Sequence, residues 1–251
     1  MNLQLLSFVD SWNGFWQDMY DVFIKSDRWK LYLEGLGNTL LIALVACLIG
    51  IVLGTVVAVL RVACINNKNN PLASKFSRVV YKIIGGITGI YISVIRGTPT
   101  LVQLLIMYYV VFASAKNGVP VAMLAFGINS GAYVAETIRG GIMSIDRGQM
   151  EAGRSLGLSN VQTMRSIILP QAIKNILPAL GNEFIMLLKE TSIVGYVAIS
   201  DLTFAGDRIR SSTFIMFPPL LIVAAIYLVI VLGLSQLLKL LERRLARSDS
   251  R

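Results

Sequence analysis

Four stretches of this sequence contain no charged residue and are long enough to cross a lipid bilayer. They cover residues 35–60, 97–115, 117–135 and 211–238. Each reaches the roughly 20 residues that a spanning helix requires. A fifth stretch, 175–199, is as apolar on average, although it carries Glu183, Lys189 and Glu190. The sequence therefore predicts about five transmembrane segments.

These segments are expected to be helices. The interior of a bilayer offers no water to the backbone, so a spanning segment must be an α-helix or a strand of a closed barrel. Barrel strands alternate apolar and polar residues, whereas these runs are long and do not alternate. A mean hydropathy of +0.68 agrees with this interpretation. We expect an all-α integral membrane protein.

Basic residues give the orientation of the predicted helices. If five spans alternate, most of the lysines and arginines fall on one side of the membrane. They are Arg61, Lys68, Lys75, Arg78, Lys82 and Arg96 around the first connection, Arg139, Arg147, Arg154, Arg165 and Lys174 around the second, and Lys239, Arg243, Arg244, Arg247 and Arg251 at the end. The positive-inside rule makes that side the cytoplasm, with the N-terminus outside and the C-terminus cytoplasmic. The net charge of +9 is thus explained by topology, and nucleic acid is not an expected partner.

One membrane domain without a detectable internal repeat is expected over residues 34–240. The leader before it, residues 1–33, mixes acidic and aromatic residues, which is typical of an extracytoplasmic or interfacial segment. The leader has neither a basic start nor a small-residue cleavage site, so we expect no cleaved signal peptide. A basic cytoplasmic tail, residues 241–251, follows the domain.

The second span is expected to be broken. Residues 79–112 are too many for one straight span and too few for two, and Gly97 and Pro99 interrupt them. We interpret 79–95 as an oblique or interfacial lead-in and 98–112 as the deep part of a discontinuous helix. A plain proline kink between two packed helices is the alternative. The third span, 119–142, is rich in small residues over 130–141, which favours close helix packing in lipid.

Between the third and fourth spans lies a segment predicted to form two short helices on the cytoplasmic side. The first covers 149–156 and can end at Gly157, while Ser159 and Gln162 form a plausible capping box for the second. We expect Pro170 to stop the second helix.

The second short helix carries an apolar stripe outside the membrane. Its members are Leu158, Val161, Met164 and Ile168, which recur at helical spacing. The stripe can lie on lipid headgroups or on the protein's own spans. Alternatively, it can dock into a groove of a cytoplasmic protein.

The segment resembles the EAA loop of permease subunits of binding-protein-dependent ABC importers, a pattern of E-A-A, three residues, G, nine residues and I-x-L-P. Glu151, Ala152, Gly157, Ile167, Leu169 and Pro170 fall at these spacings, and Gly153 replaces the second alanine. That glycine is expected to loosen the first helix slightly, by about 1 kcal/mol. The stretches RGTPTLVQ (96–103), AYVAETIRGGI (132–142), PQAIKNILPALGNEFI (170–185) and LKETS (188–192) are similar to the polar amino-acid permease branch of that family. Together the similarity covers roughly residues 33–240.

The resemblance implies a type I ABC importer permease fold with cytoplasmic coupling helices in a loop at 146–170, in a bacterial cytoplasmic membrane. Two such subunits, identical or paired with a sister, would form the pathway. A separate ABC ATP-binding subunit would receive the loop, and an extracytoplasmic substrate-binding protein would deliver a polar amino acid of cationic or amide type. The chain has no G-x-x-x-x-G-K-[ST] motif, so we expect ATP to be bound by the partner, with no cofactor, metal or catalytic residue in this chain.

The residues expected to transmit ATP hydrolysis are those of the loop pattern. They are Glu151, Ala152, Gly153, Gly157, Leu169 and Pro170. We expect Glu151 to anchor the loop, by pairing with an arginine of the ATP-binding subunit or with Arg154. An ordinary acidic residue in the first turn of a helix is the alternative for Glu151.

Polar residues at membrane depth are the substrate candidates, because they are costly there and usually functional. Glu183 follows Pro170 by about 20 Å along a helix, near the middle of the membrane. The candidates for substrate contact are Glu183, Asn182, Thr98 and Gln103; those for the pathway or its gate are Arg96, Gly97, Pro99, Lys189 and Glu190. Structural pairing of Glu183 with Lys189 or with another helix is the alternative. If Glu183 faces the substrate, a cationic amino acid is favoured.

Other functions fit less well. GINSG (127–131) comes near the G-x-S-G of a rhomboid-type intramembrane protease, but it has one residue too many and the chain has no histidine to activate Ser130. A stand-alone channel or scaffold and an ABC importer permease for another small solute remain as alternatives. Dependence on an ATPase partner would separate the channel from the importer.

Overall fold

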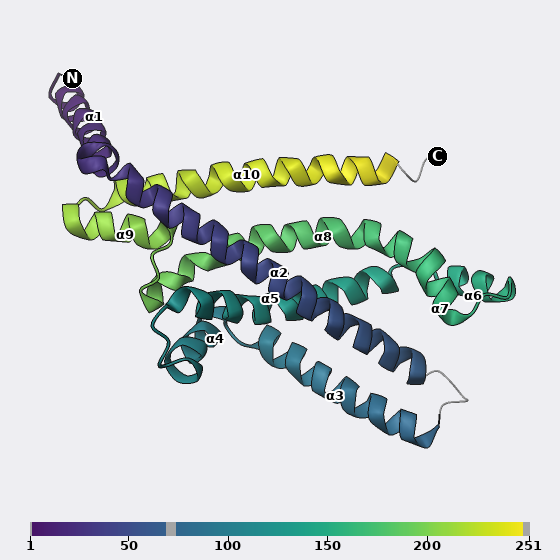
Figure 1. Cartoon of the computed structure of the whole chain (residues 1–251). Helices are drawn as coiled ribbons and strands as arrows, with labels where there is room; N and C mark the ends of the chain where they lie inside the picture. The colour runs from purple at the N-terminus through teal and green to yellow at the C-terminus, as the bar shows by residue number, and fades with distance from the viewer. Residues whose placement is uncertain (1, 69–73, 248–251) are drawn as a thin grey trace.

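The computed structural model describes residues 2–68 and 74–247, and these residues form helices joined by short connections, with no strand among them (Figure 1). The elements in chain order are α1 (Asn2–Phe23), η1 (Lys25–Asp27), α2 (Trp29–Lys68), α3 (Lys75–Gly97), α4 (Thr100–Ile106), η2 (Met107–Val111), α5 (Gly118–Met143), α6 (Arg147–Ser155), α7 (Asn160–Thr163), η3 (Met164–Ile168), α8 (Leu169–Glu190), η4 (Thr191–Val197), α9 (Leu202–Thr213) and α10 (Phe217–Arg247). The prediction of an all-α membrane protein is confirmed.

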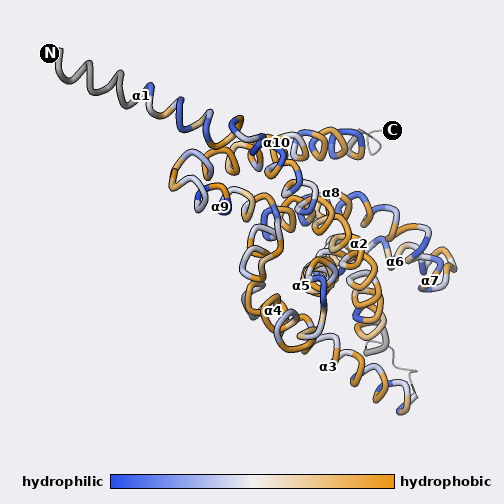
Figure 2. Tube along the Cα trace, turned by 60° about the vertical axis from the view of Figure 1, so that its left-hand side comes forward, coloured by the Kyte–Doolittle hydropathy of each residue, from blue (hydrophilic) through white to orange (hydrophobic). Residues whose placement is uncertain are grey.

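Five long helices, α2, α3, α5, α8 and α10, run between two ends of the molecule (Figure 1). Four of them are apolar and long enough to cross a membrane, within residues 25–65, 75–97, 118–143 and 217–245; α8 is the more polar fifth. Apolar residues follow the length of these helices (Figure 2). One end holds α1 and α9 and the other holds α6 and α7, and we call the latter the cytoplasmic end, following the predicted orientation.

The centre of the molecule is a close contact between α2 and α5, made possible by glycines. A Cβ atom on Gly50 would lie 2.7 Å from Ser130 Oγ, and one on Gly127 would lie 2.6 Å from Ile49 Cγ2. A Cβ atom on Gly54 would come equally close to Val134 Cβ, at 2.6 Å. The small residues of the third span therefore serve close helix packing, as predicted. The span itself, expected at 119–142, is α5.

The broken second span differs from the prediction in which part crosses the membrane. Residues 75–97 form the continuous, span-length helix α3, not an interfacial lead-in, and the part expected to be deep forms the short elements α4 and η2. The break itself falls where it was expected. Thr98 and Pro99 are extended, with ψ of 147° and 135°, because a residue before proline is pushed out of the helical region.

Arg96 does not flank the first cytoplasmic connection, as the sequence suggested. It lies in the last turn of α3, about 30 Å along that helix from Lys75. The error arose because the length of the helix before the break was unknown. Arg96 therefore lies at the opposite end of α3 from the predicted cytoplasmic connection and is not a marker of orientation.

Pro170 does not stop the second short helix. The chain continues from α7 through the π-helical turn η3 into α8, with Pro170 in the first turn of α8. Proline is tolerated in a first turn because its missing N–H has no helical partner there. The π turn η3 is wider than an α-helical turn and ends directly before α8, so Pro170 occupies a first-turn position. The second half of the cytoplasmic segment, α7 and η3, is consequently continuous with α8.

The leader and the last span also differ from a simple string of spans. Residues 2–23 form α1, whose Val22 is buried with Tyr32, Leu202 and Ile209. The charge-free run at 211–238 begins within α9, and the final helix starts only at Phe217. That helix continues to Arg247, into the predicted basic tail. Residues 1, 69–73 and 248–251, which belong to the predicted leader, connection and tail, lie outside the described residues.

Candidate functional site

Two buried polar residues in the middle of α5 connect it to the neighbouring helices. Asn129 is 2% exposed and Ser130 is fully buried. Asn129 Nδ2 donates a hydrogen bond to Gln103 Oε1 of α4 at 2.9 Å, and Ser130 Oγ donates one to Glu183 Oε1 of α8 at 3.3 Å. Buried polar groups are almost always hydrogen-bonded. The two bonds therefore join α4, α5 and α8 at one depth.

Gln103 and Thr98, both predicted to contact substrate, also close the break between α3 and α4. Gln103 Nε2 lies 2.8 Å from the Ile95 carbonyl, 3.1 Å from the Thr98 carbonyl and 2.8 Å from Thr98 Oγ1. Thr98 Oγ1 donates to the Val94 carbonyl at 2.8 Å. The last carbonyls of a helix lack intrahelical partners. Gln103, which follows Gly97 and Pro99 in the chain, supplies a hydrogen-bond partner for the Ile95 carbonyl.

Glu183 is half-buried on α8, and its partner is Ser130. Within the described chain, no ion pair joins it to Lys189, which is exposed at the end of the same helix. Glu190 is half-buried there, while Asn182 is exposed. Of the predicted α8 residues, the structure thus brings only Glu183 to the buried pair on α5.

Three arginines surround one carboxylate on α5. Arg61 Nη1 of α2 lies 2.7 Å from Glu136 Oε1, and Arg139 Nη2 lies 2.8 Å from Glu136 Oε2. Arg96 Nη1 of α3 is looser, at 4.0 Å from Glu136 Oε2, and its guanidinium lies 5.2 Å from the centre of the Tyr133 ring. The Glu136 side chain is only 19% exposed. This cluster fixes α2, α3 and α5 relative to one another and leaves an excess of positive charge.

Sequence reasoning missed Glu136, Asn129 and Ser130 as site residues. GINSG comes near a protease motif, Ser130 begins a run of small packing residues, and Arg61 and Arg139 fit the pattern of orientation markers, so none of these features pointed to a polar site. The available signal was polar residue type at membrane depth. Asn129 and Ser130 stand in the middle of the third charge-free run, and Glu136 directly follows it.

The deep polar cluster, defined as Thr98, Gln103, Asn129, Ser130 and Glu183, has charges of opposite sign at its borders. Arg96 directly precedes the break, and its guanidinium lies beside Glu136 and Tyr133 of α5. The Arg96 side chain is 43% exposed and is the least tightly held of the three arginines. One carboxylate and one accessible guanidinium can bind the cationic and the anionic group of a zwitterionic ligand, because each forms charge-assisted hydrogen bonds.

The cytoplasmic segment has the two-helix form that the sequence predicted. Asp146 caps α6, its Oδ1 accepting from the Gly148 N–H at 2.6 Å. Gly157 ends the first helix in the left-handed region, with φ of +85°. Ser159 and Gln162 form the predicted capping box, with bonds of 2.8 and 3.3 Å.

Gly153 has a packing role that the sequence did not reveal. It is buried, and a Cβ atom there would lie 2.5 Å from Thr163 Cγ2 and 3.2 Å from Ile167 Cδ1. The expectation that this glycine loosens the helix holds for α6 taken by itself. In the folded chain, it allows α6 to lie directly against α7 and η3.

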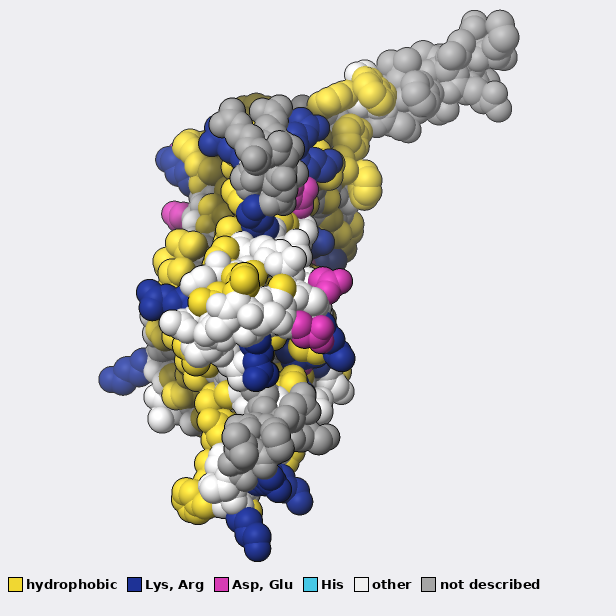
Figure 3. Space-filling model, turned by 90° about the vertical axis from the view of Figure 1, so that its right-hand side faces the viewer, with side chains coloured by type: hydrophobic (Ala, Val, Ile, Leu, Met, Phe, Trp, Pro, Cys, Tyr) yellow, Lys and Arg dark blue, Asp and Glu magenta, His cyan; other side chains and the backbone are white. Residues whose placement is uncertain are grey.

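The exposed side of the segment differs from the predicted stripe. Ile168 is buried at 4% exposure, Leu158 and Met164 are half-buried, and Val161 is 75% exposed. Leu156, outside the predicted stripe, is 81% exposed. Figure 3 looks onto this end, where Lys and Arg side chains are spread around apolar ones.

Glu151 and Ala152 are exposed on α6. Among the described residues, none forms an ion pair with the Glu151 carboxylate, so the pairing with Arg154, one of the two partners predicted for it, is not seen. Leu169 is half-buried and Pro170 exposed at the start of α8. The loop pattern therefore divides into residues that hold the segment together, Gly153 and Gly157, and residues that face outward.

Comparison with known proteins gives consistent matches over most of the chain. Residues 71–247 match the model of the family described as binding-protein-dependent transport system inner membrane component. The probable glutamine ABC transporter permease protein GlnM of Bacillus subtilis is 36% identical over 230 residues, covering 91% of this chain and 99% of that protein. The arginine transport system permease protein ArtQ of the same species is 36% identical over 228 residues, covering 86% and 93%.

Solved structures show the same fold. One chain from a crystal structure of an amino acid ABC transporter with histidines is 44% identical, has a TM-score of 0.75, and matches over 86% of this chain and 94% of its own length. A chain of the MetNI methionine ABC transporter in an inward-facing conformation has a TM-score of 0.66 at 21% identity, covering 91% and 100%. That second similarity concerns the fold alone.

Proposed function

This chain belongs to the family of binding-protein-dependent transport system inner membrane components, and on that premise we propose that it is a membrane-spanning subunit of an importer for a polar amino acid. Relatives with 36–44% identity over more than four fifths of the chain carry this support, since each is described as an amino-acid transport protein. The cargo is a cationic or amide amino acid. The membrane is the bacterial cytoplasmic membrane, and a second permease subunit, identical or a sister, completes the pathway.

Energy comes from a separate ABC ATP-binding subunit, and this chain performs no catalysis and binds no cofactor. An extracytoplasmic substrate-binding protein delivers the amino acid. The exposed Glu151, Ala152, Leu156 and Val161 form a short docking surface on α6 and α7, suited to a groove in the ATP-binding subunit. Because α7 continues without interruption into α8, a displacement of this surface moves the helix that carries Glu183.

The deep polar cluster is the proposed contact for the substrate. Glu183 receives the cationic group, and Arg96, directly before the break, receives the α-carboxylate. Thr98 and Gln103 hold the backbone around Gly97 and Pro99 in place for the passing amino acid. Lys189 and Glu190 lie at the opposite end of α8 from the cytoplasmic segment and are proposed to face the entrance.

Reconstitution of this chain with its ATP-binding subunit and binding protein tests the proposal. Uptake of arginine, glutamine or histidine should require internal ATP and the binding protein. Transport of an unrelated small solute in place of amino acids would contradict the cargo. Conduction by this chain without the ATP-binding subunit would instead indicate a channel.

A further inference from the structure

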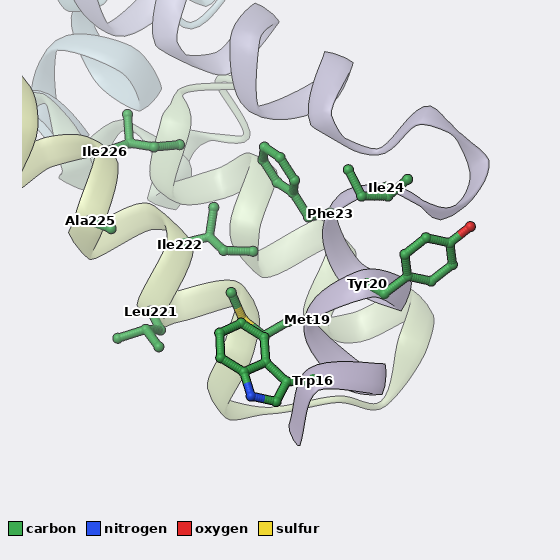
Figure 4. Close-up of a pocket in the computed structure, with 9 residues that line it drawn as sticks. All are labelled: Trp16, Met19, Tyr20, Phe23, Ile24, Leu221, Ile222, Ala225 and Ile226. Atoms are coloured by element: carbon green, nitrogen blue, oxygen red, sulfur yellow. The ribbon is translucent and has the colours of Figure 1, made fainter. Parts of the chain in front are cut away.

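A groove separates α1 from the first turns of α10, at the end of the molecule opposite the cytoplasmic segment (Figure 4). Its volume is about 590 Å³, and every residue that lines it is apolar or aromatic. Trp16, Tyr20 and Phe23 stand on the α1 side, and Leu221, Ile222 and Ala225 stand on the α10 side. We propose that this groove binds an acyl chain of a phospholipid from the outer leaflet.

The depth of the α10 wall fits such a ligand. The spanning helix begins at Phe217, so Leu221 and Ala225 lie about 6–12 Å from its outer end. The hydrocarbon core is about 30 Å thick, so this depth falls within the outer leaflet. An apolar groove there faces lipid chains and not water.

The α1 wall has the composition of a membrane interface. Trp16 and Tyr20 are each 53% exposed, and Trp12 meets Trp16 edge to face with ring centres 5.7 Å apart. Tryptophan and tyrosine prefer the headgroup level, where the ring is apolar and its N–H or O–H meets polar groups. This aromatic row therefore places the polar end of a lipid above the groove.

The groove is held open by packing on its inner side. Val22 and Tyr32 are buried at 0% and 1% exposure, in one cluster with Ile222 and Val223 of α10. Both walls thus rest on a common core, and the groove does not depend on a ligand to form. Preformed apolar concavities are typical of binding sites for small apolar groups.

A basic residue directly follows the groove-lining residues of the α1 side in the chain. Lys25 directly follows Ile24, which lines the groove, and its side chain is 57% exposed. It pairs with Asp21 at 3.2 Å, and an exposed pair of this kind is weak. Because such a pair is weak, Lys25 can exchange Asp21 for another anion such as a lipid phosphate. An acyl chain matches the apolar lining of the groove, and the aromatic row with Lys25 next to it in the chain favours a phospholipid over a purely apolar helix.

Photo-crosslinking of the assembled transporter tests this site. The complex is reconstituted into vesicles of phosphatidylethanolamine and phosphatidylglycerol that contain a phospholipid with a diazirine in its acyl chain, and crosslinked positions are mapped by mass spectrometry. We expect crosslinks to concentrate on Trp16, Leu221 and Ala225. Equal labelling of all lipid-facing positions of α10 would show only annular lipid and overturn the proposal.

Two variants sharpen the result. Ala225→Trp fills the groove and should abolish its crosslinks, whereas Leu232→Trp, two turns farther along α10 at a residue 53% exposed, should leave them unchanged. If Ala225→Trp fails to assemble, Ala225→Leu should reduce the crosslinks. A photoreactive amino acid at Leu221 provides an independent readout. A lipid adduct is expected there, and an adduct to another protein chain would show that a protein occupies the groove.

Discussion

Ser130 Oγ of α5 lies 3.3 Å from Glu183 Oε1 of α8. Ser130 belongs to the buried middle of α5, and Glu183 is a residue that the sequence predicts to contact substrate. The contact brings the half-buried Glu183 carboxylate to a fully buried hydroxyl in the middle of α5. It also gives Glu183 a partner that can remain when its charge is removed.

Glu183→Gln is expected to change substrate preference without unfolding the protein. Glutamine retains an oxygen to accept from Ser130 but cannot balance a cationic ligand. A charge-assisted hydrogen bond contributes roughly 1.5–3 kcal/mol, so uptake of arginine relative to glutamine should fall about tenfold or more. Competition assays in proteoliposomes measure this ratio. Glu242→Gln, at an exposed carboxylate of α10, is the matched control, and an unchanged ratio for Glu183→Gln would exclude its role in substrate recognition.

Glu136→Gln is expected to destabilise the assembly of α2, α3 and α5. The substitution leaves Arg61 and Arg139, both about one-third exposed, without their carboxylate. Loss of one partner of a partly buried charge cluster costs about 1–3 kcal/mol. Thermal unfolding of the purified complex should therefore begin at a lower temperature. Asp207→Asn breaks an exposed pair with Arg210 and should have little effect; equal effects of the two changes would contradict the structural role of Glu136.

Gln103→Met is expected to loosen the break between α3 and α4. Methionine has similar length but cannot bond the Ile95 and Thr98 carbonyls or accept from Asn129, so polar groups at membrane depth lose their partner. A single unsatisfied buried group costs about 1–3 kcal/mol. Cysteine accessibility at Gly97 should increase in a Gly97→Cys background. Gln149→Met on α6, at an exposed glutamine, provides the control for removal of an amide.

Gly153→Ala restores the alanine of the family pattern and is nevertheless expected to be harmful. The new methyl group would meet Thr163 Cγ2 at 2.5 Å, and overpacking of this kind costs about 1–3 kcal/mol. Coupled ATPase activity should fall, and Thr163→Ala in the same chain should recover part of it.

Gly140→Ala is the control for this glycine, because a Cβ atom there meets nothing within 4 Å. Alanine is the better helix former, so this change should be neutral or slightly stabilising. Equal loss of activity in Gly140→Ala and Gly153→Ala would show that the contact with Thr163 is not the cause.

Local features of the fold were predictable from the sequence, whereas long-range pairings were not. The predicted third span, 119–142, agrees with α5 to within one residue at each end. Hydropathy and the polar residues that flank the run are both local signals, so the sequence is sufficient to locate this helix. The capping of α7 by Ser159 and Gln162 is equally local. By contrast, Arg61 and Glu136 are 75 residues apart, and no pattern in either neighbourhood indicates the other.

The remaining errors have local geometric causes. Pro170 was expected to end a helix, because the π turn at Met164–Ile168 that accommodates it has no recognised sequence signal. The sequence placed Arg96 at the wrong end of its helix. The break at Thr98 and Pro99 was predicted, but the residues before it were not recognised as a helix long enough to cross the membrane. In both cases, the residue type was interpreted correctly and its place in three dimensions was not.

Uptake of a labelled polar amino acid into proteoliposomes that contain the complete complex, with ATP inside or absent, is the most direct measurement. We expect uptake only with ATP, the ATP-binding subunit and the binding protein present, and its loss when Glu151→Ala and Gly157→Ala are introduced together. Equal uptake without ATP, or full uptake by the double variant, would contradict a role for this chain as the membrane subunit that converts ATP hydrolysis in a partner into amino-acid import.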